Sequence, residues 1–482
     1  MSVQKPRSAF GLAFAVQFFA VLALIVVCIV TIRFSKPVSS GPKIAAISVT
    51  NIKDGETLSY PVAMLVGHID LAPATPADSQ DSGDAARPLV IEITNRDHPF
   101  PGGAMQGAVI HRQFTLLAPL SPGNNRLVLS IGKTQTPLTL NYQPGVSPYR
   151  VRVVYCLPRD GEIGFRGYAP DSKQDYEDKL DVAVKLMQTY TAEEMNRQGL
   201  GRKTFNLELD AKGHVVVHTL RFPDADKATF RKKSKNAGLE LIEMLEPWIE
   251  KQFPGAQNKT LVIPAIDGEG GGRGGGAVGV LQAPHLASWP SSLPEVTLPG
   301  WQEAHLVDLV EIGMGLHELG HCFGCEHSDE PNSIMSRGAY TLASAFAPDQ
   351  ENIAHPQWDE YDTAHFYYLR WFQPEARTFN VGAGPTIRRD DKQGLILDSP
   401  NGIGAIDLYA PSNTEDEEAA VYTQRHQILF KTGASHHIVY TPAQLKSWIG
   451  PGVQVNVLVT DTQGNSTFTE LDAATATSKD VL

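Results

Sequence analysis

The chain has 482 residues, a formal net charge of −12 and four cysteines. This length is too great for one compact core and predicts about three domains. The acidic charge and the lack of a dense Lys/Arg tract argue against nucleic-acid binding, because a phosphate-binding surface needs a basic excess. One cysteine lies in an apolar N-terminal stretch, and the other three are too few to form a disulfide framework.

Residues 9–32 are uncharged and mostly apolar, with basic residues on both sides. As a helix they would extend roughly 36 Å, enough to cross a bilayer core. A cleavable signal peptide has an apolar core of only about 7–15 residues and small residues at its cleavage site. We therefore expect residues 1–8 to be a short tail and residues 9–32 to be an uncleaved transmembrane signal anchor. The flanking basic residues do not decide the orientation, and the position of the segment alone favours an extracytoplasmic location for the rest of the chain.

Between residues 44 and 147, short apolar runs alternate with clusters of Gly, Pro, Asn and Asp. Strands are expected at 61–66, 89–93 and 127–131, and the small, polar and acidic insert at 72–88 is typical of a solvated loop. The pattern predicts a β-sandwich-like domain over residues 44–147.

A different pattern covers residues 148–375. Strands are expected at 151–157, 204–209, 215–220 and 261–266. Apolar residues at helical spacing predict helices over 172–199, 227–253, 301–323 and 358–371. Strands that alternate with long helices indicate an α/β or α+β domain. From residue 376 to 482 the short strands return, at 395–397, 406–409, 427–430 and 453–460, and predict a second all-β domain.

The third predicted helix ends in the sequence HELGHCFGCEH, residues 317–327. His317 and His321 lie one helical turn apart on the same face, a spacing that suits one tetrahedral zinc ion. Gly324 is placed where a left-handed residue would end the helix and turn the chain back, so that His327 can complete the site. Three histidine ligands leave the fourth position to water, which is typical of a catalytic zinc. We therefore expect one Zn²⁺ held by His317, His321 and His327.

Glu318 and Met335 complete the expected site. Glu318 is rotated about 100° from the first histidine, so it misses the metal but can reach a water bound to it. The predicted reaction is hydrolysis of a peptide bond by zinc-activated water, with Glu318 taking a proton from that water and passing it to the leaving amine. Met335 follows the third histidine by eight residues, where zincins with this motif have a methionine-bearing turn. A plain core methionine is the alternative.

Residues 317–335 resemble the active site of metzincins, and Ser328 is the residue that matrix metalloproteinases also have after the third histidine. The segments QTYTAEEM and GLGRKTF within 186–207, together with IMSRG at 334–338, resemble a largely uncharacterised family of putative zinc metallopeptidases best represented in fungi. This similarity covers roughly residues 149–374. It implies a metzincin-like zincin domain with a twisted sheet, a backing helix and an active-site helix. Some relatives carry a lectin-like β domain after the peptidase, which makes carbohydrate or protein a candidate ligand of the β domains.

The chain also departs from better-known metzincins. Ser328 stands where archaemetzincins have the first of the additional cysteines that hold a second zinc. Arg337 stands two residues after the methionine, where astacin- and serralysin-like enzymes have a tyrosine, so we expect no tyrosine from that turn at the oxyanion. No cysteine-switch propeptide is evident. Cys322 and Cys325 fit packed core thiols best, with a disulfide or additional metal ligation as alternatives.

The substrate cleft is the least defined part of the predicted site. In metzincins the strand before the active-site helix forms the upper rim of the cleft, so residues 275–282 are a candidate rim, with a flexible loop as the alternative. Its glycines would let a peptide backbone approach closely, and Gly276 and Ala277 are the candidate cleft residues within it. Arg337 and Tyr340 follow the methionine turn and are candidates for lining the primed side. The stretch lacks the Gly-Lys-[ST] ending of a nucleotide-binding loop.

The expected fold class is therefore an α+β or α/β zincin domain, flanked by two all-β domains and preceded by a transmembrane helix. The expected function is that of a membrane-anchored zinc endopeptidase acting on protein or peptide substrates. One alternative is a membrane-anchored binding or adhesion ectodomain with a non-catalytic zincin scaffold. Glu318 weighs against it, because a non-catalytic site would tolerate its loss. Zinc-dependent hydrolysis of a non-peptide amide is a third possibility.

Overall fold

The computed structural model describes residues 44–72, 89–161, 175–235, 238–255, 257–266, 270–297, 306–346, 354–390, 392–411, 422–432, 435–449 and 455–471. The predicted anchor at 9–32 lies outside these residues, as does nearly all of the insert at 72–88. Within the described part of the chain, no helix is long and apolar enough to cross a membrane. Residues 46–69 and 88–482 form one compact unit, and the elements below belong to it, apart from the outer ends of the first and third strands.

The N-terminal strands form one sheet of eight strands, in the order β1-β3-β6-β5-β4-β7-β8-β2. They are β1 (Ile44–Val49), β2 (Glu56–Leu58), β3 (Val62–Leu71), β4 (Leu89–Asn95), β5 (Met105–Ile110), β6 (Gln113–Pro119), β7 (Gly123–Ile131) and β8 (Thr134–Tyr142). A β-sandwich-like domain was predicted here, and its strands are hydrogen-bonded into a single sheet. Because β4 pairs with both β5 and β7, the hairpins join edge to edge into one sheet.

The central sheet has five strands in the order β10-β9-β11-β13-β12. They are β9 (Arg150–Leu157), β10 (Val217–Arg221), β11 (Asn258–Pro264), β12 (Gly271–Gly275) and β13 (Val278–Gln282). The first four in that order are parallel, and β12 returns antiparallel along β13 as the edge strand. The predicted strand at 204–209 is reduced to isolated bridges of Leu207 and Leu209. The carbonyl of Asn206 accepts from the N–H of Val151 in β9, but its N–H donates to the carbonyl of Trp371 outside the sheet.

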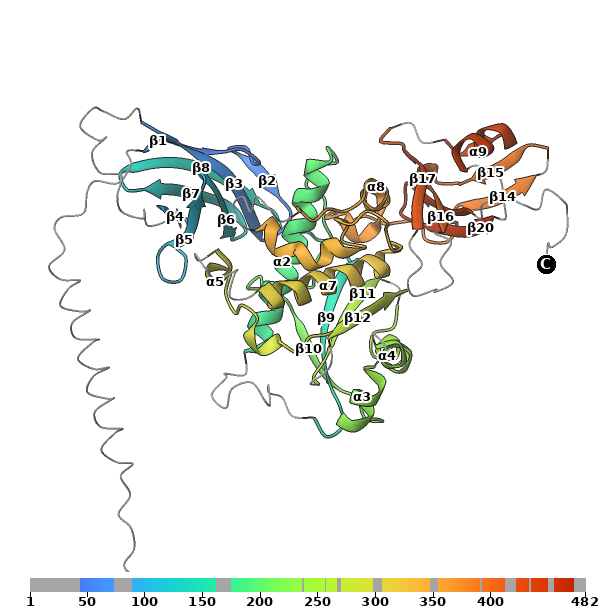
Figure 1. Ribbon diagram of the computed structural model, residues 1–482, viewed down its shortest axis with the longest axis horizontal. Coiled ribbons are helices and arrows are strands. Elements are labelled where there is room, and N and C mark those ends of the chain that lie inside the picture. The colour runs from blue at the N-terminus through green and yellow to red at the C-terminus, as the bar shows by residue number, and fades with distance from the viewer. Residues whose placement is uncertain are drawn as a thin grey trace, which may run out of the picture. The chain divides into compact units, whose positions relative to one another are not determined.

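Helices cover both faces of the central sheet (Figure 1). On one face, α7 (Leu306–Phe323) packs against β11, β12 and β13 and beside α2 (Tyr176–Arg197). On the other face, α3 (Lys227–Lys233) and α4 (Leu239–Gln252) cover a hydrophobic core that includes Val278 and Val280. One continuous helix was predicted over 227–253. It is interrupted before α4, where Gly238 has a left-handed φ of 85° that a helix does not accommodate.

The segment after α7 contains the 3₁₀ helix η4 (Arg337–Ala345), the helix α8 (Glu360–Tyr368) and the 3₁₀ turn η5 (Arg370–Phe372). Two short helices, η3 (Leu286–Ser288) and α5 (Leu293–Thr297), precede α7. The predicted helix at 358–371 is therefore an α-helix followed by a 3₁₀ turn.

The C-terminal strands form two sheets, ordered β14-β15-β18 and β17-β16-β19-β20. They are β14 (Thr386–Asp390), β15 (Gly394–Asp398), β16 (Ile403–Pro411), β17 (Tyr422–Leu429), β18 (His437–Tyr440), β19 (Val455–Asp461) and β20 (Ser466–Leu471). The two sheets share one hydrophobic core. Helix α9 (Pro442–Ile449), which was not predicted, packs Leu445 and Trp448 against this core.

Candidate metal centre

The structure brings the three predicted histidines together at the end of α7. The Nε2 atom of His321 lies 3.2 Å from Nε2 of His317 and 3.2 Å from Nε2 of His327. One nitrogen from each ring lies within 4.8 Å of the others. Ligand nitrogens about 2.0–2.1 Å from a tetrahedral metal ion are separated by about 3.3 Å. The spacing of the rings therefore suits one metal ion between them.

The end of α7 positions the second and third histidines. Gly324 follows the last helical residue with a left-handed φ of 96°. Its N–H donates to the carbonyl of His321 over 3.0 Å, and the N–H of Cys325 donates to the carbonyl of Gly320 over 3.0 Å. This pair of bonds is a Schellman motif, which reverses the chain after a helix. The carbonyl of Cys325 in turn accepts from Nδ1 of His321 over 2.9 Å.

The methionine-bearing turn contacts the same site through Ile334 and Met335. The carbonyl of Ile334 accepts from Nδ1 of His317 over 2.7 Å. Met335 is fully buried, and its Sδ lies 2.4 Å from where a Cβ at Gly320 would stand. The carbonyl of Met335 also accepts from the N–H of Ser328 over 3.0 Å, just past the third histidine. Only a glycine on α7 allows the sulfur to lie this close to the helix.

The chemistry of the donor set fits a zinc ion. Because Nδ1 of His317 and of His321 donates to a backbone carbonyl, the neutral rings have their lone pairs on Nε2, facing the third ring. Burial lowers the pKa of His317 to about 4 and that of His321 to about 3. Facing lone pairs on neutral rings repel one another unless a cation lies between them, and imidazole nitrogens are preferred zinc ligands.

Glu318 is buried beneath the edge strand β12. A Cβ at Gly272 would stand 2.6 Å from its Cγ and 2.7 Å from its Oε1, and a Cβ at Gly274 would stand 2.2 Å from its carbonyl oxygen. Burial raises the pKa of Glu318 to about 8, and the positive charge of Arg273 partly opposes this rise. The alternate glycines therefore let the strand lie directly on the carboxylate, a contact that the sequence analysis missed. The i, i+2 spacing of the glycines was the available signal.

The predicted cleft residues occupy two places. The rim was expected at 275–282, a range that contains β13. The edge strand is instead β12, because β13 lies between β11 and β12 in the sheet. Gly276 and Ala277 form the hairpin turn, where their carbonyls accept from Nζ of Lys259 and from the N–H of Thr260. Arg337 and Tyr340 are exposed at the start of η4, which packs on α7.

The three described cysteines are free and buried. Burial raises the pKa of Cys156 to about 12 and that of Cys322 to about 12, and it raises the pKa of Cys325 well above its usual value. Among the described residues, the group of side chains that could hold a metal ion consists of the three histidines and includes no cysteine. The packed-thiol interpretation is the one that agrees with the structure, and no disulfide links these three residues.

Part of the chain is similar to a known family. Residues 46–236 match the model of a family described as a putative peptidase family. The match begins in the N-terminal sheet, about a hundred residues before the expected start, and ends before the histidine motif.

Two curated relatives are fungal. A putative zinc metalloproteinase of Schizosaccharomyces pombe is 24% identical over 355 residues, which cover 59% of this chain and 55% of the relative. A putative zinc metalloproteinase of Saccharomyces cerevisiae is 24% identical over 439 residues, which cover 73% of this chain and 59% of the relative. The matches thus span less than two thirds of either relative's length. The predicted resemblance to putative zinc metallopeptidases of fungi is confirmed.

Solved structures are similar at a lower level. Wild-type OgpA from Akkermansia muciniphila has a TM-score of 0.45 and 15% identity, covering 67% of this chain and 93% of that chain. Archaemetzincin from Methanopyrus kandleri has a TM-score of 0.24 and 16% identity, covering 45% of this chain and 93% of that chain.

Proposed function

We propose that this chain is a zinc-dependent endopeptidase. The observation that carries the proposal is the convergence of three histidine nitrogens beside a buried glutamate, with His321 Nε2 3.2 Å from the other two. His317, His321 and His327 would hold one zinc ion. Zinc at such a site supplies Lewis acidity, which polarises a carbonyl and acidifies water at neutral pH. The names of the fungal relatives agree with this chemistry.

Glu318 is the residue that moves the proton in this proposal. Its carboxylate would take a proton from the attacking water and return it to the nitrogen of the leaving amine. Its burial under β12 keeps the carboxylate out of bulk solvent, and burial raises its pKa to about 8. A nearby cation would lower that pKa toward neutrality, the range in which one group can both accept and return a proton.

The edge strand is the proposed binding surface for the substrate backbone. Among the described residues, β12 pairs with β13 along one edge and with no strand along the other. An extended peptide could add to this edge as a further strand. Arg337 and Tyr340, both exposed, stay candidates for the primed side. The transmembrane anchor at residues 9–32 and an extracytoplasmic location of the site are also part of this proposal, and both rest on the sequence alone.

The test is a digest of a peptide library by the full-length chain, with the products identified by mass spectrometry. We expect internal peptide bonds to be cleaved, the cleavage to stop with a zinc chelator and to return with added zinc. Glu318→Gln should keep one zinc per chain, measured by elemental analysis, while cleavage falls by about 10²–10⁴-fold.

Glu243→Gln is the matched control, because Glu243 is an exposed glutamate on α4. It should cleave as fast as the unaltered chain. If Glu318→Gln also does so, the role of Glu318 is wrong. If the unaltered chain binds zinc but cleaves no peptide, the non-catalytic scaffold replaces the endopeptidase.

A further inference from the structure

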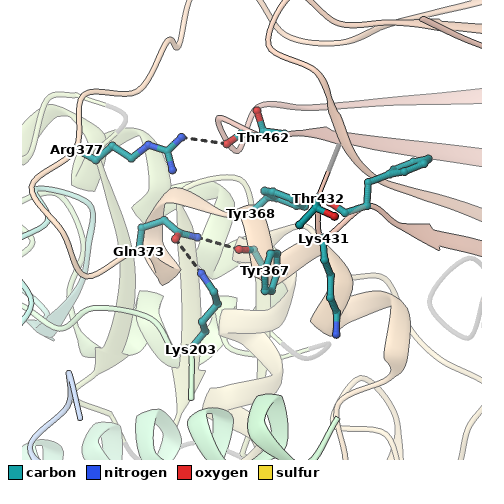
Figure 2. Close-up of a pocket in the computed structure, with 9 residues that line it drawn as sticks. Lys203, Tyr367, Tyr368, Gln373, Arg377, Lys431, Thr432 and Thr462 are labelled. Carbon is teal, nitrogen blue, oxygen red and sulfur yellow. Dashed lines mark hydrogen bonds between the residues drawn. The ribbon is translucent and has the colours of Figure 1, made fainter. Parts of the chain in front are cut away.

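A polar cavity of about 340 Å³ contains none of the residues of the metal centre (Figure 2). Its lining comes from distant parts of the chain. Lys203 follows α2, Tyr367 is in α8, Arg377 follows η5, Lys431 follows β17, and Thr462 lies in the turn between β19 and β20. The volume is at the lower end of the range of small-molecule sites, which is about 300–1,000 Å³. The cavity is therefore large enough for a small polar ligand.

The charge of this cavity is opposite to that of the chain. Three of its nine lining residues, Lys203, Arg377 and Lys431, are cationic, and none is a carboxylate. The whole chain has a formal net charge of −12. Three cations in the lining create a local positive potential, which attracts anions. The acid that acts on Lys203 is Glu375, which is not part of the lining.

The three cations contact neutral groups. Nζ of Lys203 donates to Oε1 of Gln373 over 3.0 Å and lies 4.6 Å from the centre of the Tyr367 ring. The guanidinium of Arg377 donates to the carbonyl of Thr462 over 3.4 Å, as Figure 2 shows. Nζ of Lys431 donates to the carbonyl of Gly199 over 3.1 Å.

These contacts leave hydrogen-bonding capacity in the cavity. An ammonium has three N–H donors and a guanidinium has five. Lys203, Arg377 and Lys431 each use one of them in a hydrogen bond, and none forms an ion pair within the described part of the chain. Several charged donors therefore remain for a ligand, including the planar fork of Arg377, which suits bidentate binding of an oxyanion.

The environment of Lys203 points the same way. Burial lowers the pKa of its ammonium. The Glu375 carboxylate opposes this effect, and the charge of Arg377, the smallest of the three influences, lowers the pKa further. A half-buried cation next to another cation is stabilised when an anion binds between them.

We propose that this cavity binds a small ligand through a phosphate, sulfate or carboxylate group, held by Lys203, Arg377 and Lys431. The cavity exceeds the size of a bare oxyanion, so the ligand has a polar body that lies beside Tyr367 and Thr462. This site is independent of the proposed peptidase reaction. The lining joins α8 to the strands after residue 422, so the cavity exists only in the folded chain. A bound ligand therefore stabilises the folded chain by mass action.

The test is a calorimetric titration of the full-length chain in a cationic buffer, which does not itself occupy an anion site. The probes are inorganic phosphate and glucose 6-phosphate, with glucose as the neutral counterpart of the second. We expect saturable binding of both phosphates, no binding of glucose, and weaker binding as the salt concentration rises. Tighter binding of glucose 6-phosphate than of phosphate would indicate an organic phosphate as the ligand.

Variants place the binding in the cavity. Lys203→Gln and Arg377→Gln should each weaken phosphate binding by on the order of tenfold or more, because each removes a charged hydrogen bond. Lys446→Gln, at an exposed position of α9, removes the same charge elsewhere and should bind as the unaltered chain does. Arg377 is itself exposed, so its replacement tests the site without disturbing a core.

Phosphate also has affinity for zinc, so the titration is repeated after chelation and dialysis. Binding that survives metal removal supports the cavity. Binding that disappears with the metal overturns the proposal, as does equal affinity of Lys203→Gln, Arg377→Gln and Lys446→Gln. Failure of the peptidase proposal leaves these outcomes unchanged, because they are read without any substrate.

Discussion

Nε2 of His365 donates a hydrogen bond of 2.8 Å to the carbonyl of Phe323, the last residue of α7. On the other side of the ring, Nδ1 accepts from the hydroxyl of Thr460, on β19, over 2.6 Å. His365 lies in α8, and its imidazole is buried. It satisfies a carbonyl at the end of α7 that has no partner within the helix. One neutral histidine thus links the helix that carries the metal centre to the C-terminal strands.

This link predicts a pH dependence of stability. Burial lowers the pKa of His365 from 6.5 to about 4. The unfolded chain then binds more protons than the folded chain between these values, so the free energy of unfolding falls as the pH drops from about 6.5 to about 4. His365→Gln has no titrating group at this position. The slope of its unfolding free energy against pH should therefore be smaller by up to about 1.4 kcal/mol per pH unit. Chemical denaturation at a series of pH values measures it. Parallel curves for the two proteins would contradict the prediction.

The turn after α7 yields a second prediction. Gly324 has a φ of 96°, and a Cβ there would stand 3.2 Å from Nε2 of His365. Gly213 has a φ of 84° and no atom within 4 Å of its Cβ position. Alanine at either position should lower the free energy of unfolding by about 1–2 kcal/mol, because a left-handed backbone disfavours a side chain.

Only the first replacement should also weaken zinc binding. The turn at Gly324 positions the Cys325 carbonyl, which orients His321. Loss of such a hydrogen-bond partner typically lowers metal affinity by about 10–100-fold. A competition titration with a chromogenic chelator compares Gly324→Ala with Gly213→Ala. Equal zinc affinity of the two variants would show that this turn does not hold the ligands.

The cluster of three histidines was predictable because its parts are close in sequence. Helical spacing places His317 and His321 on one face, and the left-handed glycine brings His327 back within six residues. His365 could not be found this way, since it lies 42 residues after the carbonyl that it contacts. The contact depends on how α8 packs on α7, which no local pattern encodes.

The larger elements show the same limit. Many helix and strand positions followed from apolar spacing, whereas the pairing of strands did not. The eight N-terminal strands form one sheet because β4 has partners on both sides, and strand order depends on contacts between distant residues. The break before α4 depends on Gly238, whose left-handed φ is visible only in the folded chain.

A third prediction concerns the contact between α2 and the first strands. Nε of Arg202 lies 2.8 Å from Oε1 of Glu193, and both side chains are less than a tenth exposed. The same guanidinium also contacts Glu56 and the carbonyl of Asn51. Replacing Arg202 leaves the buried Glu193 charge without a cation, with only the neutral donors Asn51 and Tyr60 beside it. Arg202→Gln should therefore lower the free energy of unfolding by about 3–5 kcal/mol.

Arg388 offers a comparison at the surface. It pairs with Asp398 over 2.8 Å, and the two side chains are 61% and 35% exposed. Solvent screens such a pair, so Arg388→Gln should cost no more than about 1 kcal/mol. Calorimetry of the two variants gives the difference as a shift of Tm. Equal shifts would mean that the Arg202 network adds no more stability than a surface ion pair.

The last prediction rests on the proposed peptidase activity and on the glycines of β12. A Cβ at Gly272 would stand 2.6 Å from Cγ of Glu318, whereas a Cβ at Gly275 on the same strand meets no atom within 4 Å. Neither glycine has a left-handed φ. The backbone contribution of alanine to the free energy of unfolding should therefore be the same at both positions. Gly272→Ala should displace the Glu318 carboxylate and leave the histidines in place.

We therefore expect Gly272→Ala to lower kcat/KM for a cleaved peptide by about 10²-fold, because a displacement of about 1 Å in a reacting group can cost that much. Its zinc content should stay at that of Gly275→Ala, and Gly275→Ala should cleave at nearly the unaltered rate. Peptide cleavage and elemental analysis on the same samples separate the two effects. Loss of zinc in Gly272→Ala would mean that the strand supports the metal ligands. Equal cleavage by both variants would mean that the strand does not position Glu318 at all.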